Sequence, residues 1–294
     1  MYELIQVGEH TYYIQSPAKV GVYVPDGKNA WLIDAGGDKD AGRRVRKVMD
    51  EQGWTVKGIL VTHSNADHIG GCKYLQGQYG CKVFSGGVEG AFTQWPKLEP
   101  SFLYGGYPFA ELRHKFLMAE PCQVSPLDDP DYPSEVVPIP LPGHFFDMVG
   151  FRTPDDVVFL ADCVSSAAVL GKYHIGFIYD VAAYLKTLGD ISALSAALFV
   201  PAHADACADV RPLAELNRAK VEEVAEAIVE LCREPVCFEA LLQKLFARYG
   251  LTMTFEQYVL VGSTVRSYLA WLKDGGRLSA RIEDNALLWE RASL

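Results

Sequence analysis

Short apolar runs alternate with polar turns at the start of the chain, which is the pattern of antiparallel strands. These strands are predicted at residues 2–7, 11–15, 20–24 and 30–33. Apolar residues then recur every three to four positions over residues 38–53, which predicts an amphipathic helix. By the same reasoning, later strands are predicted at residues 59–61, 82–85, 136–139, 149–152, 157–160 and 198–200, with helices at residues 72–79 and 181–196.

The apolar run at residues 59–61 ends abruptly in T-H-S-N-A-D-H-I-G-G. This turn supplies His63, Asn65, Asp67 and His68, all side chains of types that ligate metals. A tight turn at the end of a buried strand holds such side chains rigidly and directs them into a cleft. The glycines that follow allow the backbone to pass close to such a site.

Three later apolar runs also end in a residue of a ligand type. His144 lies in L-P-G-H-F, Asp162 ends V-V-F-L-A-D, and His203 lies in L-F-V-P-A-H-A. Each is expected where a strand gives way to a loop. Together with the first turn, these positions predict a metal cleft at one edge of a sheet sandwich.

The ordered pieces T-H-x-x-x-D-H, P-G-H, a strand that ends in Asp, and V-P-x-H resemble the metallo-β-lactamase superfamily, including its glyoxalase II-like branch. The segment W-L-I-D-A-G-G resembles the family's first motif, in which the carboxylate, here Asp34, supports a metal ligand from behind. The resemblance covers residues 1–210. It implies an α/β (α+β) fold, a four-layer αβ/βα sandwich of two mixed β-sheets flanked by helices.

The resemblance also implies two metal positions that share a carboxylate. The first takes His63, Asn65 and His144, the second takes Asp67, His68 and His203, and Asp162 bridges them. The family pattern is H-x-H-x-D-H, and here Asn65 stands at the second histidine. An amide oxygen is a poorer ligand than imidazole for a borderline-soft ion, so only the first position is weakened. One or two divalent ions are therefore expected, with zinc first and iron or manganese as alternatives.

A divalent metal among nitrogen and oxygen ligands makes water nucleophilic near neutral pH and polarises carbonyl groups. The expected function is hydrolysis of an ester, thioester, lactone or related bond in a small molecule, with Asp67 as a catalytic residue that orients the water. One alternative is a non-hydrolytic metal- or ligand-binding protein whose first metal position is degenerate. Another is a non-haem iron oxygenase, since two histidines and a carboxylate also suit Fe(II).

Residues 86–135 are rich in glycine, proline and aromatic residues and are interpreted as a loop-like insertion on the substrate side. A satellite core or a subunit contact is the alternative. His114, within the insertion, is expected to be a surface or core residue. Residues 170–176 are weakly similar to the G-K-[FY] segment of glyoxalase II enzymes, which makes Lys172, Tyr173 and His174 candidate substrate contacts. For His174 a structural role is the better-supported alternative.

Residues 211–294 predict a second unit, with helices at residues 214–232, 238–249 and 254–272 and a hairpin over residues 277–289. Three helices and a hairpin resemble a winged helix. The unit holds 11 Lys and Arg residues against 12 Asp and Glu residues, whereas DNA readers present a basic face. We therefore expect it to pack, dimerise or cap the site.

Charge and cysteine content limit the possible partners. The formal net charge of −10 over 294 residues argues against binding to nucleic acid or to anionic membranes. Seven cysteines without a C-x-x-C pair indicate reduced thiols. The N-terminal residues lack the features of a signal peptide, so a cytoplasmic protein is expected. The expected partner is a small-molecule substrate, and a homodimer is possible.

Overall fold

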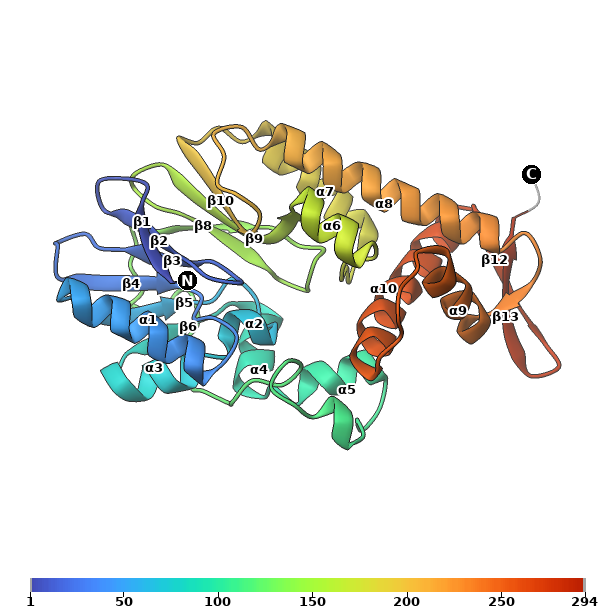
Figure 1. The fold of residues 1–294 in the computed structure, drawn as a ribbon, viewed down its shortest axis with the longest axis horizontal. Coiled ribbons are helices and arrows are strands. Elements are labelled where there is room, and N and C mark those ends of the chain that lie inside the picture. Colours follow the sequence, from blue (N-terminus) through green and yellow to red (C-terminus); the bar gives the residue numbers. More distant parts are fainter. Residues whose placement is uncertain (1, 293–294) are drawn as a thin grey trace.

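Six consecutive strands form the first sheet of the computed structural model, which describes residues 2–292 (Figure 1). They are β1 (Glu3–Gln6), β2 (Thr11–Gln15), β3 (Val20–Tyr23), β4 (Asn29–Ile33), β5 (Thr55–Leu60) and β6 (Lys82–Phe84). The strands lie in sequence order, antiparallel from β1 to β4 and parallel from β4 to β6. The sheet is therefore mixed, and each predicted strand of this half of the chain is present.

The second sheet has four strands in the order β10-β9-β8-β7. They are β7 (Val137–Pro140), β8 (Val149–Arg152), β9 (Val157–Ser165) and β10 (Leu198–His203). β7, β8 and β9 are antiparallel neighbours, whereas β10 runs parallel to β9 after a helical crossover. This sheet is mixed as well.

The two sheets face each other across an apolar layer that includes Phe84, Phe151 and Phe159. Helices α1 (Lys39–Gln52) and α3 (Cys72–Tyr79) cover the outer face of the first sheet, and α7 (Val181–Ala193) and α8 (Arg211–Leu231) pack on β9 of the second (Figure 1). The order of layers is helix, sheet, sheet, helix. The predicted four-layer sandwich of two mixed sheets is confirmed.

The insertion at residues 86–135 contains more regular structure than its composition suggested. It forms α4 (Gly87–Gln94), α5 (Leu98–Tyr104) and a 3₁₀ turn at Ala110–Leu112. Its loop-like interpretation is therefore wrong for these segments, because the aromatic residues pack against one another and provide the apolar contacts that short helices need. The sequence reasoning also missed α6 (Ala167–Tyr173), which is capped by Ser166.

The C-terminal region contains the three predicted helices, namely α8, α9 (Phe238–Arg248) and α10 (Phe255–Asp274). The terminal hairpin, β12 (Leu278–Glu283) and β13 (Ala286–Arg291), gains a third strand, β11 (Val236–Cys237), which was not predicted because it is so short. The side chain of Thr254 accepts a hydrogen bond from the amide of Gln257 and so caps α10. Helices α8, α9 and α10 share one apolar core with the second sheet. The domain boundary at residue 210 stays a prediction.

No helix within residues 2–292 is both long enough and apolar enough to cross a membrane.

Gly143 lies where the loop that presents His144 meets helix α7. It has φ +119°, and a Cβ atom there would lie 2.2 Å from the backbone nitrogen of Tyr184. We expect Gly143→Ala to lower the free energy of unfolding by about 3 kcal/mol, because it combines backbone strain with overpacking. Urea denaturation of the metal-free protein measures this loss. Gly171→Ala is the matched control, since a Cβ at Gly171 meets nothing within 4 Å, and an equal loss in both variants would contradict the prediction.

Candidate metal centre

Two glycine-rich turns pack together directly beneath the site. After β5 the chain turns through residues 61–65 and enters the four-residue helix α2 (Ala66–Ile69). A Cβ at Gly70 would lie 2.2 Å from the carbonyl oxygen of Gly37, and one at Gly71 would lie 2.2 Å from that of Ala35. Only glycine permits this approach. The turn after β4, at residues 34–37, and the turn with its helix at residues 61–69 therefore fix each other's position.

Asp34 orients the metal-ligand turn from behind. The residue adopts φ 64°, and its buried carboxylate accepts hydrogen bonds from the backbone amide and the hydroxyl of Thr62, both at 2.8 Å. The same carboxylate lies 2.8 Å from Nδ1 of His68, and Oγ1 of Thr62 lies 3.0 Å from Nδ1 of His63. Both histidine rings are thereby held with Nε2 toward the site, an arrangement that increases the basicity of a metal-binding histidine.

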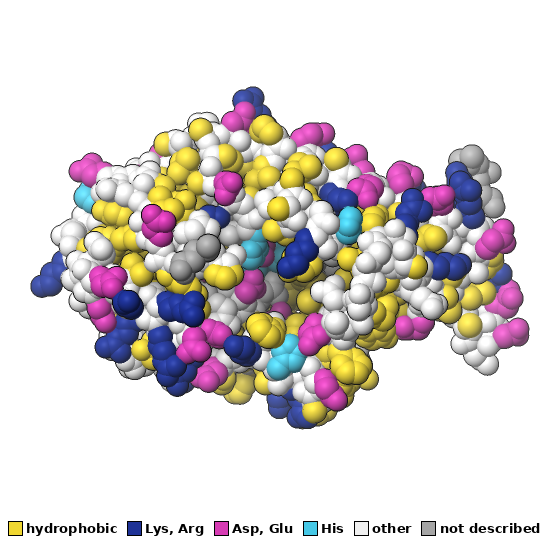
Figure 2. All heavy atoms as spheres, viewed as in Figure 1, with side chains coloured by type: hydrophobic (Ala, Val, Ile, Leu, Met, Phe, Trp, Pro, Cys, Tyr) yellow, Lys and Arg dark blue, Asp and Glu magenta, His cyan; other side chains and the backbone are white. Residues whose placement is uncertain are grey.

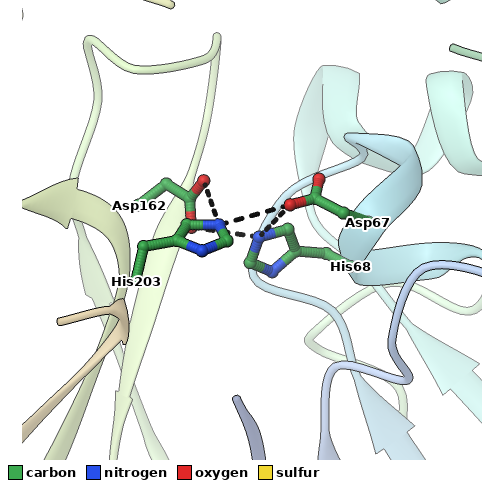
Figure 3. A group of neighbouring side chains, drawn as sticks. All are labelled: Asp67, His68, Asp162 and His203. Atoms are coloured by element: carbon green, nitrogen blue, oxygen red, sulfur yellow. Dashed lines mark ion pairs between the residues drawn. The ribbon is translucent and has the colours of Figure 1, made fainter. Parts of the chain in front are cut away.

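Asp67, His68, Asp162 and His203 form one group whose ligand atoms lie within 4.8 Å of one another (Figure 3). Nε2 of His68 lies 3.0 Å from Oδ1 of Asp162. Nε2 of His203 lies 3.2 Å from a carboxylate oxygen of Asp67 and 3.2 Å from one of Asp162. Nδ1 of His203 faces the carbonyl oxygen of Pro17 at 3.1 Å, which fixes the ring. The group therefore combines residues of α2, which follows β5 of the first sheet, with residues of β9 and β10 in the second sheet.

His63, His144 and Asp162 form a second group, again with ligand atoms within 4.8 Å of one another. Nε2 of His144 lies 3.7 Å from Oδ2 of Asp162 and 3.1 Å from Oδ1 of Asn65. Asp162 belongs to both groups, as the resemblance implied for a bridging carboxylate. The structure thus brings all seven predicted ligand positions together, while their binding of metal stays a prediction.

Asp162 lies within β9 rather than at its end, which corrects the sequence-based placement. Val200 of β10 pairs with Phe159 and Pro201 pairs with Ala161, so Leu160 is an extra residue in β9. Ala161 has φ 49°, which interrupts the regular pleat. Such a bulge redirects the side chains that follow it, and here the next residue is Asp162.

Charges within the site balance one another. Burial opposes the charged form of His68, but the carboxylates of Asp162, Asp67 and Asp34 raise its pKa well above the usual range. The carboxylate of Asp162 also raises the pKa of His203 to about 10. For His63, burial lowers the pKa well below the usual range, and the neighbouring His68 lowers it further. The carboxylates therefore make this group attractive to positive charge.

The donor atoms fit a divalent metal. Among the described residues, Nε2 of His63 is a buried atom without a hydrogen-bond partner. Nε2 of His68 and Oδ1 of Asp162 lie 3.0 Å apart as an ion pair, but neither makes a directed hydrogen bond. Buried polar atoms are ordinarily paired, and unpaired ones at a converging site mark a place for an ion. Imidazole nitrogens and carboxylate oxygens suit zinc, iron and manganese.

A pocket of about 670 Å³ opens beside the two groups and is reached by Asp67, His144 and Asp162. Figure 2 shows histidine and acidic side chains together in the hollow near the middle of this face. The C-terminal helices also line the pocket, with the apolar Val221, Leu260 and Val261 beside the polar Lys220 and Gln257. The C-terminal region thus forms a side of the pocket, one of the roles expected for it.

Lys172, Tyr173 and His174 also line this pocket but belong to neither ligand group. Nζ of Lys172 lies 3.0 Å from the hydroxyl of the exposed Tyr173. The ring of His174 stacks on that of Tyr249 with centroids 5.0 Å apart. Contact between these residues and a substrate stays a prediction.

His114 pairs with Glu256 at 3.0 Å, at the N-terminus of α10. The insertion and the C-terminal region therefore meet beside the pocket, where Phe109 also packs on Phe255.

Two buried glutamates of the insertion escaped the sequence reasoning. Glu89 accepts hydrogen bonds from the amide and hydroxyl of Ser64, at 2.9 and 2.6 Å, and from the amide of Asp147, at 3.0 Å. Burial raises its pKa to about 7. Glu99 accepts a hydrogen bond from Nδ2 of Asn65 at 2.8 Å, and burial raises its pKa well above the usual range. A usable signal was the spacing, since each glutamate lies three or four positions from a buried apolar residue of its helix.

The family model described as the Metallo-beta-lactamase superfamily matches residues 15–203. Short segments are also similar to curated hydroxyacylglutathione hydrolases. The protein from Nitrobacter hamburgensis is 51% identical over 39 residues, which cover 13% of this chain and 15% of that protein. The one from Bradyrhizobium sp. (strain ORS 278) is 46% identical over 44 residues, which cover 15% and 17%. The chain therefore matches less than a fifth of the length of these relatives.

Solved structures show the same fold over nearly the whole chain. A beta-lactamase domain protein from Burkholderia ambifaria aligns with a TM-score of 0.74 at 16% identity, covering 99% of this chain and 94% of that one. A metallo-beta-lactamase family protein from Thermus thermophilus aligns with a TM-score of 0.71 at 19% identity, covering 98% and 97%. The fold, the ordered motifs and the family model agree, and the chain belongs to the metallo-beta-lactamase superfamily.

Proposed function

We propose that this protein is a metal-dependent hydrolase that cleaves an ester, thioester or lactone bond in a small molecule. The observation that carries the proposal is the position of Asp162, which belongs to two groups of ligand atoms beside one pocket. The short similarity to hydroxyacylglutathione hydrolases supports a thioester as a test substrate. We infer zinc as the resident ion, with iron or manganese as alternatives.

The ligand side chains form two sets, and each set would hold one ion. His63, Asn65, His144 and Asp162 would hold one ion, and Asp67, His68, His203 and Asp162 would hold another. Divalent ions in such a site supply Lewis acidity and make water more acidic.

Asp67 has the exposure that a catalytic carboxylate needs, since about half of its side chain, 51%, is accessible. Its oxygen 3.2 Å from His203 can accept a hydrogen bond from a water molecule and so orient it. The buried carboxylate of Asp34 holds the ring of His68 directly and that of His63 through the hydroxyl of Thr62.

The apolar side chains of Val221, Leu260 and Val261 in the pocket lining support an acyl group as the part of the substrate that is buried. Lys172 and Tyr173 lie at the exposed side of the same pocket, where they can contact a polar or anionic leaving group. These two surfaces and Asp67 line one pocket. A substrate in the pocket therefore places its scissile bond beside the water that Asp67 orients.

Metal removal tests the proposal. The protein is stripped with a chelator, dialysed and reloaded separately with Zn²⁺, Mn²⁺ or Fe²⁺. Each form is assayed against 4-nitrophenyl esters, acyl thioesters and lactones of increasing chain length. We expect turnover only in a reloaded form, with a rate lowered about 10³-fold after stripping, since the ion supplies several kcal/mol of transition-state stabilisation. Metal-loaded protein that hydrolyses none of these substrates would instead support the non-hydrolytic alternative.

A further inference from the structure

Three side chains of the metal centre are each held by a buried polar group through the end that does not face the other ligand atoms. Asp34 faces Nδ1 of His68 at 2.8 Å, and the hydroxyl of Thr62 faces Nδ1 of His63 at 3.0 Å. Glu99 stands in the same relation to Asn65, whose Nδ2 donates to Oε1 of Glu99 at 2.8 Å. In each case the other end of the side chain points to the place where the ligand atoms converge.

An amide has one donating and one accepting end, so fixing one end fixes the other. Because Glu99 takes the N–H of Asn65, Oδ1 of Asn65 faces Nε2 of His144 at 3.1 Å. Without Glu99 the amide could rotate and present N–H groups to the metal position, which would repel a cation. Glu99 is only 4% exposed, and it comes from α5 of the insertion rather than from a family motif.

We propose that Glu99 is a positioning residue that holds Asn65 with its amide oxygen as a ligand of the first metal position, beside His63 and His144. This inference rests on the proposed function in so far as that function requires metal. Oε1 of Glu99 accepts the N–H of Asn65 and so decides which end of the amide faces His144. The pair of Asn65 and Glu99 thereby compensates for the histidine that the family pattern has at position 65.

The first position then offers two imidazole nitrogens, an amide oxygen and the shared Asp162, whereas the second retains its usual set. Oxygen ligands favour harder ions. The first position therefore binds its ion more weakly than the second does, and its affinity depends on Asn65 and Glu99. The affinity of the second position does not depend on them.

A double-mutant cycle on metal affinity tests the proposal. Metal-free wild type, Glu99→Leu, Asn65→Ala and the double variant are titrated with Zn²⁺ against a chromophoric chelator, and bound metal is counted by elemental analysis. We expect Glu99→Leu to lower the affinity for the more weakly bound ion about 10–100-fold. Loss of the hydrogen-bond partner of a metal ligand has an effect of this size. Because Glu99 acts through Asn65, adding Glu99→Leu to Asn65→Ala costs nothing further.

Two further variants separate positioning from a general structural effect. Glu99→Gln keeps an oxygen that can accept from Asn65, so its affinity is expected to lie between those of the wild type and Glu99→Leu. Glu111→Gln, on an exposed glutamate of the same insertion, is the matched control and leaves both affinities unchanged. Thermal melting in chelator shows whether each variant is folded before metal is added.

Two results would overturn the proposal. One is a Glu99→Leu protein that binds two ions as tightly as the wild type. The other is additive losses in the double variant, which would mean that Glu99 acts independently of Asn65. Since the assay counts ions and not turnover, a protein that binds two metals through Asn65 but hydrolyses nothing would contradict the proposed function while supporting this inference.

Discussion

Asp162→Asn is expected to lower metal-dependent hydrolysis by about 10³-fold and to reduce bound metal from two ions per chain to at most one. Asp162 is the one carboxylate that belongs to both ligand groups among the described residues, at 3.0 Å from His68 and 3.2 Å from His203. An amide in its place supplies no negative charge and only one oxygen. Steady-state rates and elemental analysis of the same preparation measure the two losses together.

Asp128→Asn is the matched control, because Asp128 is exposed on the insertion, away from the ligand groups. It is expected to keep both ions and the full rate. Unchanged metal content in Asp162→Asn would show that the ion or ions depend on other ligands. A normal rate in that variant would remove Asp162 from the proposed mechanism.

Asp34→Asn is expected to weaken metal binding about 10–100-fold and to lower the free energy of unfolding by about 1–3 kcal/mol. The carboxylate of Asp34 accepts from three donors, two on Thr62 and one on His68. Asparagine tolerates the positive φ of this position but turns an N–H group toward at least one of those donors. Zinc titration measures the first effect, and urea denaturation of the metal-free protein measures the second.

Asp40→Asn serves as the comparison for Asp34→Asn. Asp40 lies in the first turn of α1 and pairs only with the exposed Arg43 in the described structure, so both affinity and stability are expected to stay near their wild-type values. If Asp34→Asn binds zinc as tightly as the wild type does, the histidine rings do not need the carboxylate for their orientation.

Much of the fold could be predicted from the sequence because strand and helix periods are local. The strands of the first sheet, α1 and α3 were all expected from apolar spacing and turn residues. Predictions were wrong where tertiary contacts decide the conformation. Helices α4 and α5 are short and gain their stability from packing among aromatic residues, which no local pattern expresses.

In the candidate site, too, the residues in local motifs were predictable, whereas features that depend on tertiary contacts were not. His63, Asp67, His68, His144 and His203 lie in short motifs at the ends of strands or in adjacent turns, so their types and order were readable in advance. Asp162 was found, but its place inside β9 was not, because the bulge arises from register with β10.

Glu89 and Glu99 were not found because their importance comes from burial against residues 25 and 34 positions away. The pocket wall formed by α8 and α10 was anticipated only as one role among several. Which helix faces meet there depends on packing between distant segments rather than on any motif.

The sequential order of the first sheet bears on how the protein folds. Each strand from β1 to β6 pairs only with its neighbours in the chain among the described strands, so this sheet consists of comparatively local contacts. Local contacts form quickly because they close short loops. A chain emerging from the ribosome can therefore complete this half, with His63, Asp67 and His68 in place, before the second sheet exists. Since His144, Asp162 and His203 are synthesised later, both ligand groups are complete only after the second sheet has packed on the first.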